Sequence, residues 1–298
     1  MKLLDQVAQA KLALDIEDDT GRYELPGVGE LASAVTACPT RFIAEPNVAR
    51  YCASLLATEH GMLAACNEYL RVPACQFWLE WPCVSAGDTM PGLRTGVLVQ
   101  ADDGGRRGRL AVIWEQPLGE PLAAQMIVSF DLDHDLYRKA ENECFALCAG
   151  SHPLAAHLLF AFKPDWQRHL GSLSEGDILA AAGQIVSTML ADIEFLLVFS
   201  ALLAERTCLR QNHVDMSRLN CRRSDKGKPP LLDHAEVRLD LVQDDGGHPR
   251  DAGDRKPARL HTVRGHMVHR SGHAFWRRSH LRGDPSRPGW VRTVRVTR

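Results

Sequence analysis

The chain has 298 residues, a length typical of about two domains, and its 45% hydrophobic and 24% charged residues exclude a disordered chain, a collagen-like fibre and a small disulfide scaffold. The net charge of −2 conceals an asymmetry: residues 255–298 hold 12 Lys and Arg and one acid, whereas residues 1–254 hold 23 basic and 36 acidic residues. An acidic body with a basic C-terminal segment indicates a polyanionic partner without naming a reaction.

The first half of the chain predicts helices followed by an antiparallel sheet. Apolar residues recur at helical spacing, Phe77, Leu79 and Trp81 alternate as in a strand, and Asp102-Asp103-Gly104-Gly105 has the composition of a hairpin turn. The predicted elements are helices at 3–15 and 46–69 and strands at 73–83, 93–101, 109–115 and 125–132.

Residues 174–207 predict the longest helix. Ser174 is a suitable N-cap, and Asp177 stands three residues later, where a capping box needs its second member. The helix is apolar enough to raise the question of a membrane span. However, Asp192 and Glu194 near its centre would each cost roughly 2.5–3.5 kcal/mol at mid-bilayer. We therefore expect a helix buried against the sheet and no membrane contact.

The remaining chain is read as three segments after an acidic α+β body at 1–207. The first is a basic loop and strand at 208–242, with Lys226 and Lys228 in its KGKPP loop as candidate phosphate contacts around Gly227. The second is a flexible loop at 243–258, and the third is a basic β-meander at 259–298. The expected fold class is α+β.

The C-terminal meander carries the densest constellation of candidate binding residues. Strands are expected at 259–270, 273–280 and 290–296, and cationic side chains there alternate with aromatic ones, as in a nucleic-acid groove. A solvated basic face with Trp276 in a small core is the competing interpretation. The candidate nucleic-acid contacts of the meander are Arg264, His266, Arg270, Trp276, Arg277, Arg278, His280 and Arg282.

No catalytic motif stands out, and we expect neither a cofactor nor a metal. The histidines between 261 and 280 lack the paired spacing of a zinc site. Asp131, Asp133 and Asp135 alternate like metal ligands, but capping of a following helix is the preferred interpretation. The nine cysteines show no C-x-x-C pair, and the chain shows no signal segment, which favours free thiols and a cytoplasmic location.

One pattern resembles a known group of proteins. Lys226-Gly227-Lys228-Pro229-Pro230-Leu231, Val263-Arg264-Gly265-His266, Trp276 and His280-x-Arg282-Gly283-Asp284 resemble uncharacterised proteins of bacteriophages and prophages of proteobacteria. The resemblance implies a mobile-element setting in a bacterial cytoplasm, and it carries no catalytic residue.

The leading expectation is a non-catalytic phage or prophage accessory protein that binds DNA or RNA through the basic C-terminal meander. A metal-dependent nuclease or other nucleic-acid-modifying enzyme is the first alternative. A virion or assembly component that acts through protein contacts is the second.

Overall fold

The computed structural model divides the chain into two compact units. One comprises Met1–Ala204 with Gln211–Arg238, and the other comprises Glu205–Arg210 with Leu239–Arg298. The structure describes residues 1–11, 13–18, 21–26, 28–58, 63, 70–84, 89–116, 121–136, 154–164, 166, 174–204, 208–239, 242–243, 261–263, 266–270, 273–277 and 280–282. The sequence predicted 208–242 as a separate segment, but most of it belongs to the first unit.

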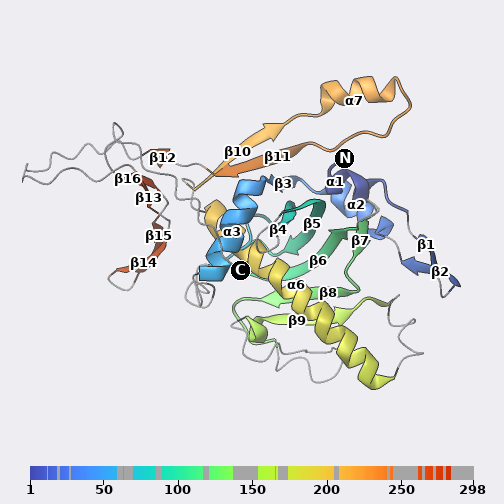
Figure 1. Cartoon of the computed structure of the whole chain (residues 1–298), viewed down its shortest axis with the longest axis horizontal. Coiled ribbons are helices and arrows are strands. Elements are labelled where there is room, and N and C mark those ends of the chain that lie inside the picture. Colours follow the sequence, from blue (N-terminus) through green and yellow to red (C-terminus); the bar gives the residue numbers. More distant parts are fainter. Residues whose placement is uncertain are drawn as a thin grey trace, which may run out of the picture. The chain divides into compact units, whose positions relative to one another are not determined.

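A nine-stranded mixed sheet organises the first unit (Figure 1). Its strand order is β10-β11-β3-β4-β5-β6-β8-β9, and β7 pairs with β6. The strands are β3 (Thr40–Ala44), β4 (Gln76–Val84), β5 (Thr89–Ala101), β6 (Arg107–Glu115), β7 (Pro121–Ala123), β8 (Met126–Asp131), β9 (Leu158–Phe162), β10 (Leu209–Val214) and β11 (His234–Leu239). Together with its helices, this sheet confirms the predicted α+β class.

The antiparallel half of the sheet contains the predicted hairpin. β5 and β6 pair from Ala101 opposite Gly108 onward. The connecting turn works because Gly105 adopts a φ of 66°, a conformation that other residues rarely adopt. Asp102 closes the turn, since its Oδ1 accepts a hydrogen bond from the Arg106 N–H at 3.1 Å. Local turn chemistry therefore fixes this part of the fold.

The other half of the sheet contains two parallel pairings, which the sequence did not predict. β11 pairs with β3, and β3 pairs with β4, both in parallel. Parallel neighbours need a crossover, and helix α3 (Pro46–Thr58) supplies part of it between β3 and β4. Residues 59–62 and 64–69 of the predicted helix 46–69 lie outside the described residues.

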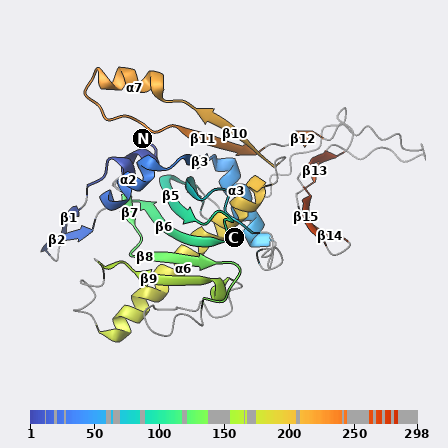
Figure 2. The same ribbon diagram turned by 180° about the vertical axis from the view of Figure 1, so that it is seen from behind.

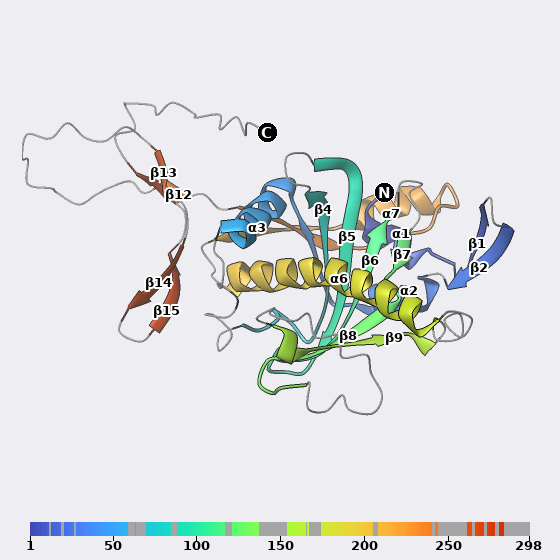
Figure 3. The ribbon, with the colours of Figure 1, turned by 60° about the horizontal axis from the view of Figure 1, so that its bottom comes forward.

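Helix α6 (Glu175–Ala204) confirms the predicted long core helix. Ser174 caps it: the Asp177 N–H donates to Ser174 Oγ at 3.2 Å. α6 lies along the sheet beside α3 (Figure 3), and the ring of Phe195 stacks on Trp81 with centroids 4.2 Å apart. Among the described helices, α6 alone is long and apolar enough to cross a membrane, but 61% of its apolar stretch is buried in the protein.

The opposite face of the sheet carries the short helix α1 (Leu3–Ala8), which the sequence placed at 3–15. The buried Glu80 anchors it, because its two carboxylate oxygens accept the N–H groups of Leu3 and Leu4 at 3.1 and 2.9 Å. Side chains alternate along β4, so Glu80 and Trp81 face opposite sides of the sheet. The chain then forms a hairpin of β1 (Ala13–Asp18) and β2 (Gly21–Pro26) and helix α2 (Gly29–Ala37), none of which the sequence predicted.

The second unit contains short strands in two small sheets. β12 (Val242–Gln243), β16 (His280–Arg282) and β13 (His261–Val263) form one sheet. β14 (His266–Arg270) and β15 (His273–Arg277) form the predicted hairpin. The predicted single strand at 259–270 thus contributes to two sheets, because β13 pairs with β16 and not with β15. Residues 244–258 and 290–296 lie outside the described part of the chain.

Candidate nucleic-acid interface

A basic arm projects between β10 and β11 of the first unit. We use this name for residues 217–228, which comprise helix α7 (Ser217–Ser224) and the turn that follows it. Figures 1 and 2 show α7 from opposite sides, in both cases at one end of the β10–β11 pair. Its five cationic residues, against the single acid Asp225, are Arg218, Arg222, Arg223, Lys226 and Lys228.

The local sequence explains why α7 forms and where it ends. At its start, the Ser217 N–H donates to Asp215 Oδ1 at 2.7 Å, and the Met216 N–H donates to Asp233 Oδ1 at 2.7 Å. Carboxylates at this end favour the helix because its unpaired N–H groups carry partial positive charge. At the other end Gly227 adopts a φ of 63°. The Lys228 N–H then donates to Arg223 O and the Gly227 N–H to Ser224 O, both at 2.9 Å, which is the Schellman pattern.

The chain after α7 is fastened back onto the helix. The Asn220 side chain donates through Nδ2 to Leu231 O and accepts through Oδ1 from Leu231 N–H, both at 2.8 Å. Arg223 Nε donates to Pro229 O at 2.9 Å. The base of the arm is joined to α1, since the Leu232 N–H donates to Asp5 Oδ1 at 2.9 Å. The arm therefore presents its charges from a fixed backbone.

The charges of the arm are directed to solvent. Arg218, Arg222, Lys226 and Lys228 are exposed, and Arg223 is half-buried. Among the described residues, none of the arm's cations forms an ion pair, whereas Arg106 of the turn between β5 and β6 binds Asp133 at 2.6 Å. Cationic side chains without an acidic partner, held on a hydrogen-bonded backbone, can contact the phosphates of a nucleic acid.

The structure places two of the predicted contacts, Lys226 and Lys228, at the C-terminal end of α7. Cations at this position also interact favourably with the helix dipole, so a purely structural role competes with phosphate binding. Arg218 and Arg222 were missed as candidate contacts. Their i, i+4 spacing puts them on one face of a helix, and this signal was available once a helix at 217–224 was considered.

The other predicted contacts belong to the second unit, where the structure shows the strand pairing. In the β14–β15 hairpin, His266 lies opposite Arg277, Met267 lies opposite Trp276, and Arg270 lies opposite His273. Directly opposed residues share a face, so positions 266, 270 and 277 are on one face and position 276 is on the other.

His280 and Arg282 belong to the other small sheet, opposite Val263 and His261. Arg264 and Arg278 lie outside the described residues.

The carboxylates at the end of β8 have structural partners. Asp131 Oδ1 accepts the N–H groups of Asp133 and His134, both at 3.0 Å. Asp131 also lies 3.5 Å from Arg107, and Asp133 pairs with Arg106. The helix expected after them falls at 137–153, outside the described residues. Within the part of the chain that the structure covers, no group of three or more His, Cys, Asp or Glu could hold a metal ion.

A second polar cluster lies between α6 and the sheet. Trp114 Nε1 donates to Asp192 Oδ2 at 2.9 Å, and Thr95 also hydrogen-bonds Asp192. Burial raises the pKa of the Asp192 carboxyl to about 7, against the lowering effect of these two bonds. Burial likewise raises the pKa of the neighbouring Cys83 thiol, which keeps it protonated and a poor nucleophile. Among the described residues, the cluster thus combines a carboxyl of raised pKa with a thiol that is not activated.

Comparison of the chain with family models, with curated proteins and with solved structures gives no match. The resemblance to phage and prophage proteins therefore stays a prediction, and the candidate interface depends on its geometry and charge.

Proposed function

We propose that the protein binds nucleic acid, DNA or RNA, without catalysis. The observation that carries this proposal is the fixed basic arm, whose cations have no acidic partner among the described residues. Such side chains displace counterions from a phosphate backbone, and the release of those ions drives binding. The basic strands of the second unit add further cationic positions.

The setting belongs to the same proposal. The protein acts in a bacterial cytoplasm as an accessory factor of a phage or prophage. The resemblance of the KGKPPL and VRGH segments to proteins of mobile elements supports this setting. The acidic body suits the role, since its negative charge disfavours contact with the polyanion away from the basic surfaces.

The salt dependence of binding tests the arm. The affinity for DNA or RNA should fall steeply as salt rises, by about 0.9 in log–log slope for each phosphate contact with duplex DNA and about 0.7 with a single strand. Arg218→Ala with Arg222→Ala should reduce that slope by up to about 2 for duplex DNA. Fluorescence anisotropy with labelled oligonucleotides between 50 and about 300 mM salt measures it.

The matched control removes the same charge elsewhere. Arg50 on α3 and Arg109 on β6 are also exposed, so Arg50→Ala with Arg109→Ala should leave the slope unchanged. Equal effects of the two double variants would show that only net charge matters and would contradict an arm interface. Absence of binding at low salt, with a native circular dichroism spectrum, would remove the proposal.

The second unit can be tested in the same titration. Arg277→Ala with Arg278→Ala should lower the slope by up to about 2 for duplex DNA if both contact phosphates. Trp276→Ala should weaken single-strand binding by roughly 1–3 kcal/mol with little change in slope if a base stacks on it. Circular dichroism must accompany this variant, because loss of a core tryptophan would also reduce binding.

A further inference from the structure

Strand β10 forms one edge of the sheet and leads into the basic arm, and part of it is open to solvent on both faces. Gln211, Asn212 and His213 follow one another and are all exposed. Neighbouring side chains of a strand point to opposite faces, so no described element covers either face at these positions. Figures 1 and 2 show β10 on the outer side of β11. The three residues belong to the first unit, as does the arm.

One face of β10 stays open as far as the arm. Gln211 and His213 share this face, and Asp215 follows two positions later; all three are exposed. On the other face, Val214 next to Asn212 is half-buried. Hydrogen bonds from Ser217, and to a smaller extent the nearby His213, lower the pKa of Asp215, which places a carboxylate beside the imidazole. We call Gln211, His213 and Asp215 the open face of β10.

The chemistry of the open face suits the edges of bases better than phosphates. Phosphate oxygens only accept hydrogen bonds, so a carboxylate beside them is unfavourable. Base edges in the major groove of DNA offer acceptors and also the amino donors of adenine and cytosine. Among the described residues, the Gln211 amide has no hydrogen-bond partner, and it can pair with N7 and N6 of adenine. A neutral His213 adds one donor and one acceptor.

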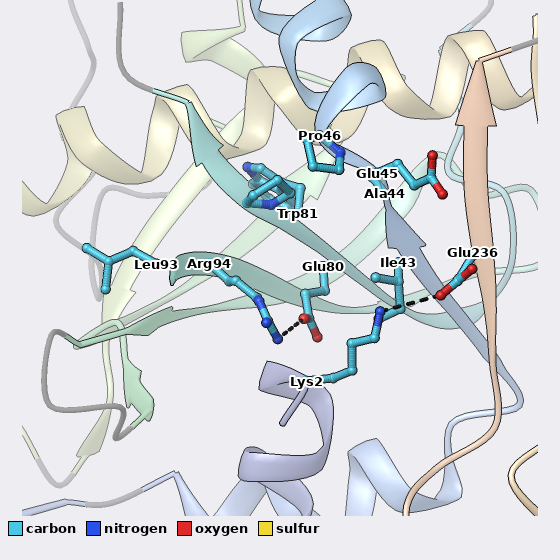
Figure 4. A pocket seen from close by; sticks show the side chains of 11 residues that line it. Lys2, Ile43, Ala44, Glu45, Pro46, Glu80, Trp81, Leu93, Arg94 and Glu236 are labelled. Atoms are coloured by element: carbon cyan, nitrogen blue, oxygen red, sulfur yellow. Dashed lines mark hydrogen bonds and ion pairs between the residues drawn. The ribbon is translucent and has the colours of Figure 1, made fainter. Parts of the chain in front are cut away.

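The surroundings of β10 are compatible with a polyanion. On the neighbouring strand β11, Glu236 lies 3.7 Å from the Lys2 ammonium (Figure 4) and 3.3 Å from Arg238. Asp233 accepts the Met216 N–H at 2.7 Å. Residues 211–233 contain five Arg and Lys against three Asp, and all five cations lie in the arm. The phosphate-binding charges thus follow directly after the open face.

An edge strand is narrow enough for the major groove of DNA. This groove is about 12 Å wide, and neighbouring strands of a sheet lie only about 4.8 Å apart. Duplex RNA has a deep and narrow major groove that side chains cannot read. In complexes with DNA, phosphate contacts fix the register and base contacts carry the sequence information. The arm and the open face offer these two kinds of contact side by side in the chain.

We propose that β10 reads base edges in the major groove of duplex DNA through Gln211 and His213, while the arm holds the adjacent phosphates. Gln211 pairs with an adenine. The inference rests on the proposed function, because it concerns the same binding event. It adds that the partner is duplex DNA and that binding is sequence-specific.

Selection from a pool of random-sequence duplexes by the full chain, followed by sequencing, tests this inference. Fluorescence anisotropy then compares the selected duplex with a scrambled duplex of the same composition. Gln211→Ala should weaken binding to the selected duplex about 5- to 100-fold, because one bidentate base contact is lost. Binding to the scrambled duplex and the salt slope should not change, since no phosphate contact is removed.

Three further variants control for position, shape and charge. Asn212→Ala removes the same amide from the opposite face of β10 and should leave the preference unchanged. Gln211→Glu keeps the shape, but a carboxylate accepts from cytosine N4, so a new selection should yield cytosine in place of adenine at one position. Arg218→Ala with Arg222→Ala should weaken binding to both duplexes alike. A native circular dichroism spectrum is required of each variant.

The outcomes separate this inference from the proposed function. Binding to duplex DNA without any enriched sequence would overturn the inference and leave the proposed function intact. Tighter binding to RNA than to the selected duplex would do the same, as would an equal loss of preference in Asn212→Ala and Gln211→Ala. Absence of binding to any nucleic acid would remove the proposed function, and this inference with it.

Discussion

Asp192 is an acidic residue in the middle of an apolar helix, and its partners explain how it is tolerated. It receives hydrogen bonds from Trp114 and Thr95, which reach it from neighbouring strands of the sheet. Burial raises the pKa of its carboxyl to about 7, so the side chain can remain neutral in the core at mildly acidic pH. The residue that argues against a membrane span from sequence is thus part of the helix–sheet interface.

The pH dependence of stability should reveal this carboxyl. Its pKa is raised on folding from 3.8 to about 7, so its contribution to stability is complete below about pH 4 and is lost as pH rises through 7. The free energy of unfolding should therefore fall between pH 5 and 8, by at most about 1.4 kcal/mol per pH unit from this group.

Asp192→Asn keeps an acceptor for Trp114 and should remove that part of the pH dependence. Urea-induced unfolding of the two proteins at pH 5, 6, 7 and 8 measures the difference. Parallel pH profiles would show that Asp192 is ionised throughout.

At the scale of the element, a glycine inside α6 and a glycine in the turn after α7 should respond in opposite ways to the same substitution. Gly183 lies inside α6, and an added Cβ would meet no atom within 4 Å. Gly183→Ala should raise the free energy of unfolding by about 1 kcal/mol, because alanine loses less backbone entropy in a helix. Gly227 also has open space around it, but its φ of 63° disfavours any side chain.

Gly227→Ala should loosen the end of α7 by about 1 kcal/mol. Local opening of the arm does not require unfolding of the whole protein, so the effect should be larger in amide hydrogen exchange than in global unfolding. We expect the amides of α7 to exchange about fivefold faster. Urea denaturation serves for Gly183→Ala. An unchanged exchange rate in α7 would contradict the role assigned to the Schellman turn.

The elements that could be predicted from sequence are those whose signals are local. The turn at Asp102–Gly105 and the long, mostly apolar helix α6 could be recognised without a distant partner. α1 was predicted too long because the apolar spacing continues beyond Ala8, while the anchor that positions the helix, Glu80, comes from β4. Parallel β3 was missed for the same reason, since its partner β11 lies far along the chain.

In the candidate site, too, residues with a local sequence signal were predicted and those positioned by distant contacts were not. Lys226 and Lys228 were proposed as phosphate contacts from composition, with Gly227 expected to let the backbone approach a phosphate; the structure shows that Gly227 ends the helix through its positive φ. Arg218 and Arg222 were missed because α7 is set by Asp215, Asp233 and the Asn220–Leu231 clamp, which only the fold brings together.

At the scale of the whole molecule, the division into two units coincides with the division of charge. The second unit contains the basic segment 255–298, and the first contains most of the acidic residues. The stretch 243–258, which lies within the second unit, is rich in Gly, Asp and Pro and poor in large apolar residues. From this composition we predict a flexible loop, although residues 244–258 lie outside the described part of the chain.

Limited proteolysis should therefore cut first within 243–258, where Arg250 and Arg255 offer trypsin sites. Mass spectrometry of the early fragments measures it. We expect an acidic fragment that contains α6 and the basic arm, and a basic C-terminal fragment. Early cleavage inside α6, with 243–258 intact, would contradict the division.

The parallel pairing of β3 has a consequence for how the protein is made. The Arg41 guanidinium binds Asp233 O across 192 positions of the chain, and Leu232 binds Asp5 across 227. A ribosome adds about 5–20 residues per second, so β11 is synthesised roughly 10–40 s after β3. During that interval one edge of an internal strand is open to pairing with another nascent chain. The strand that covers the edge of β3 is thus the last part of the first unit to be translated. A product that stops before His234 contains the antiparallel half of the sheet but leaves the edge of β3 unpaired.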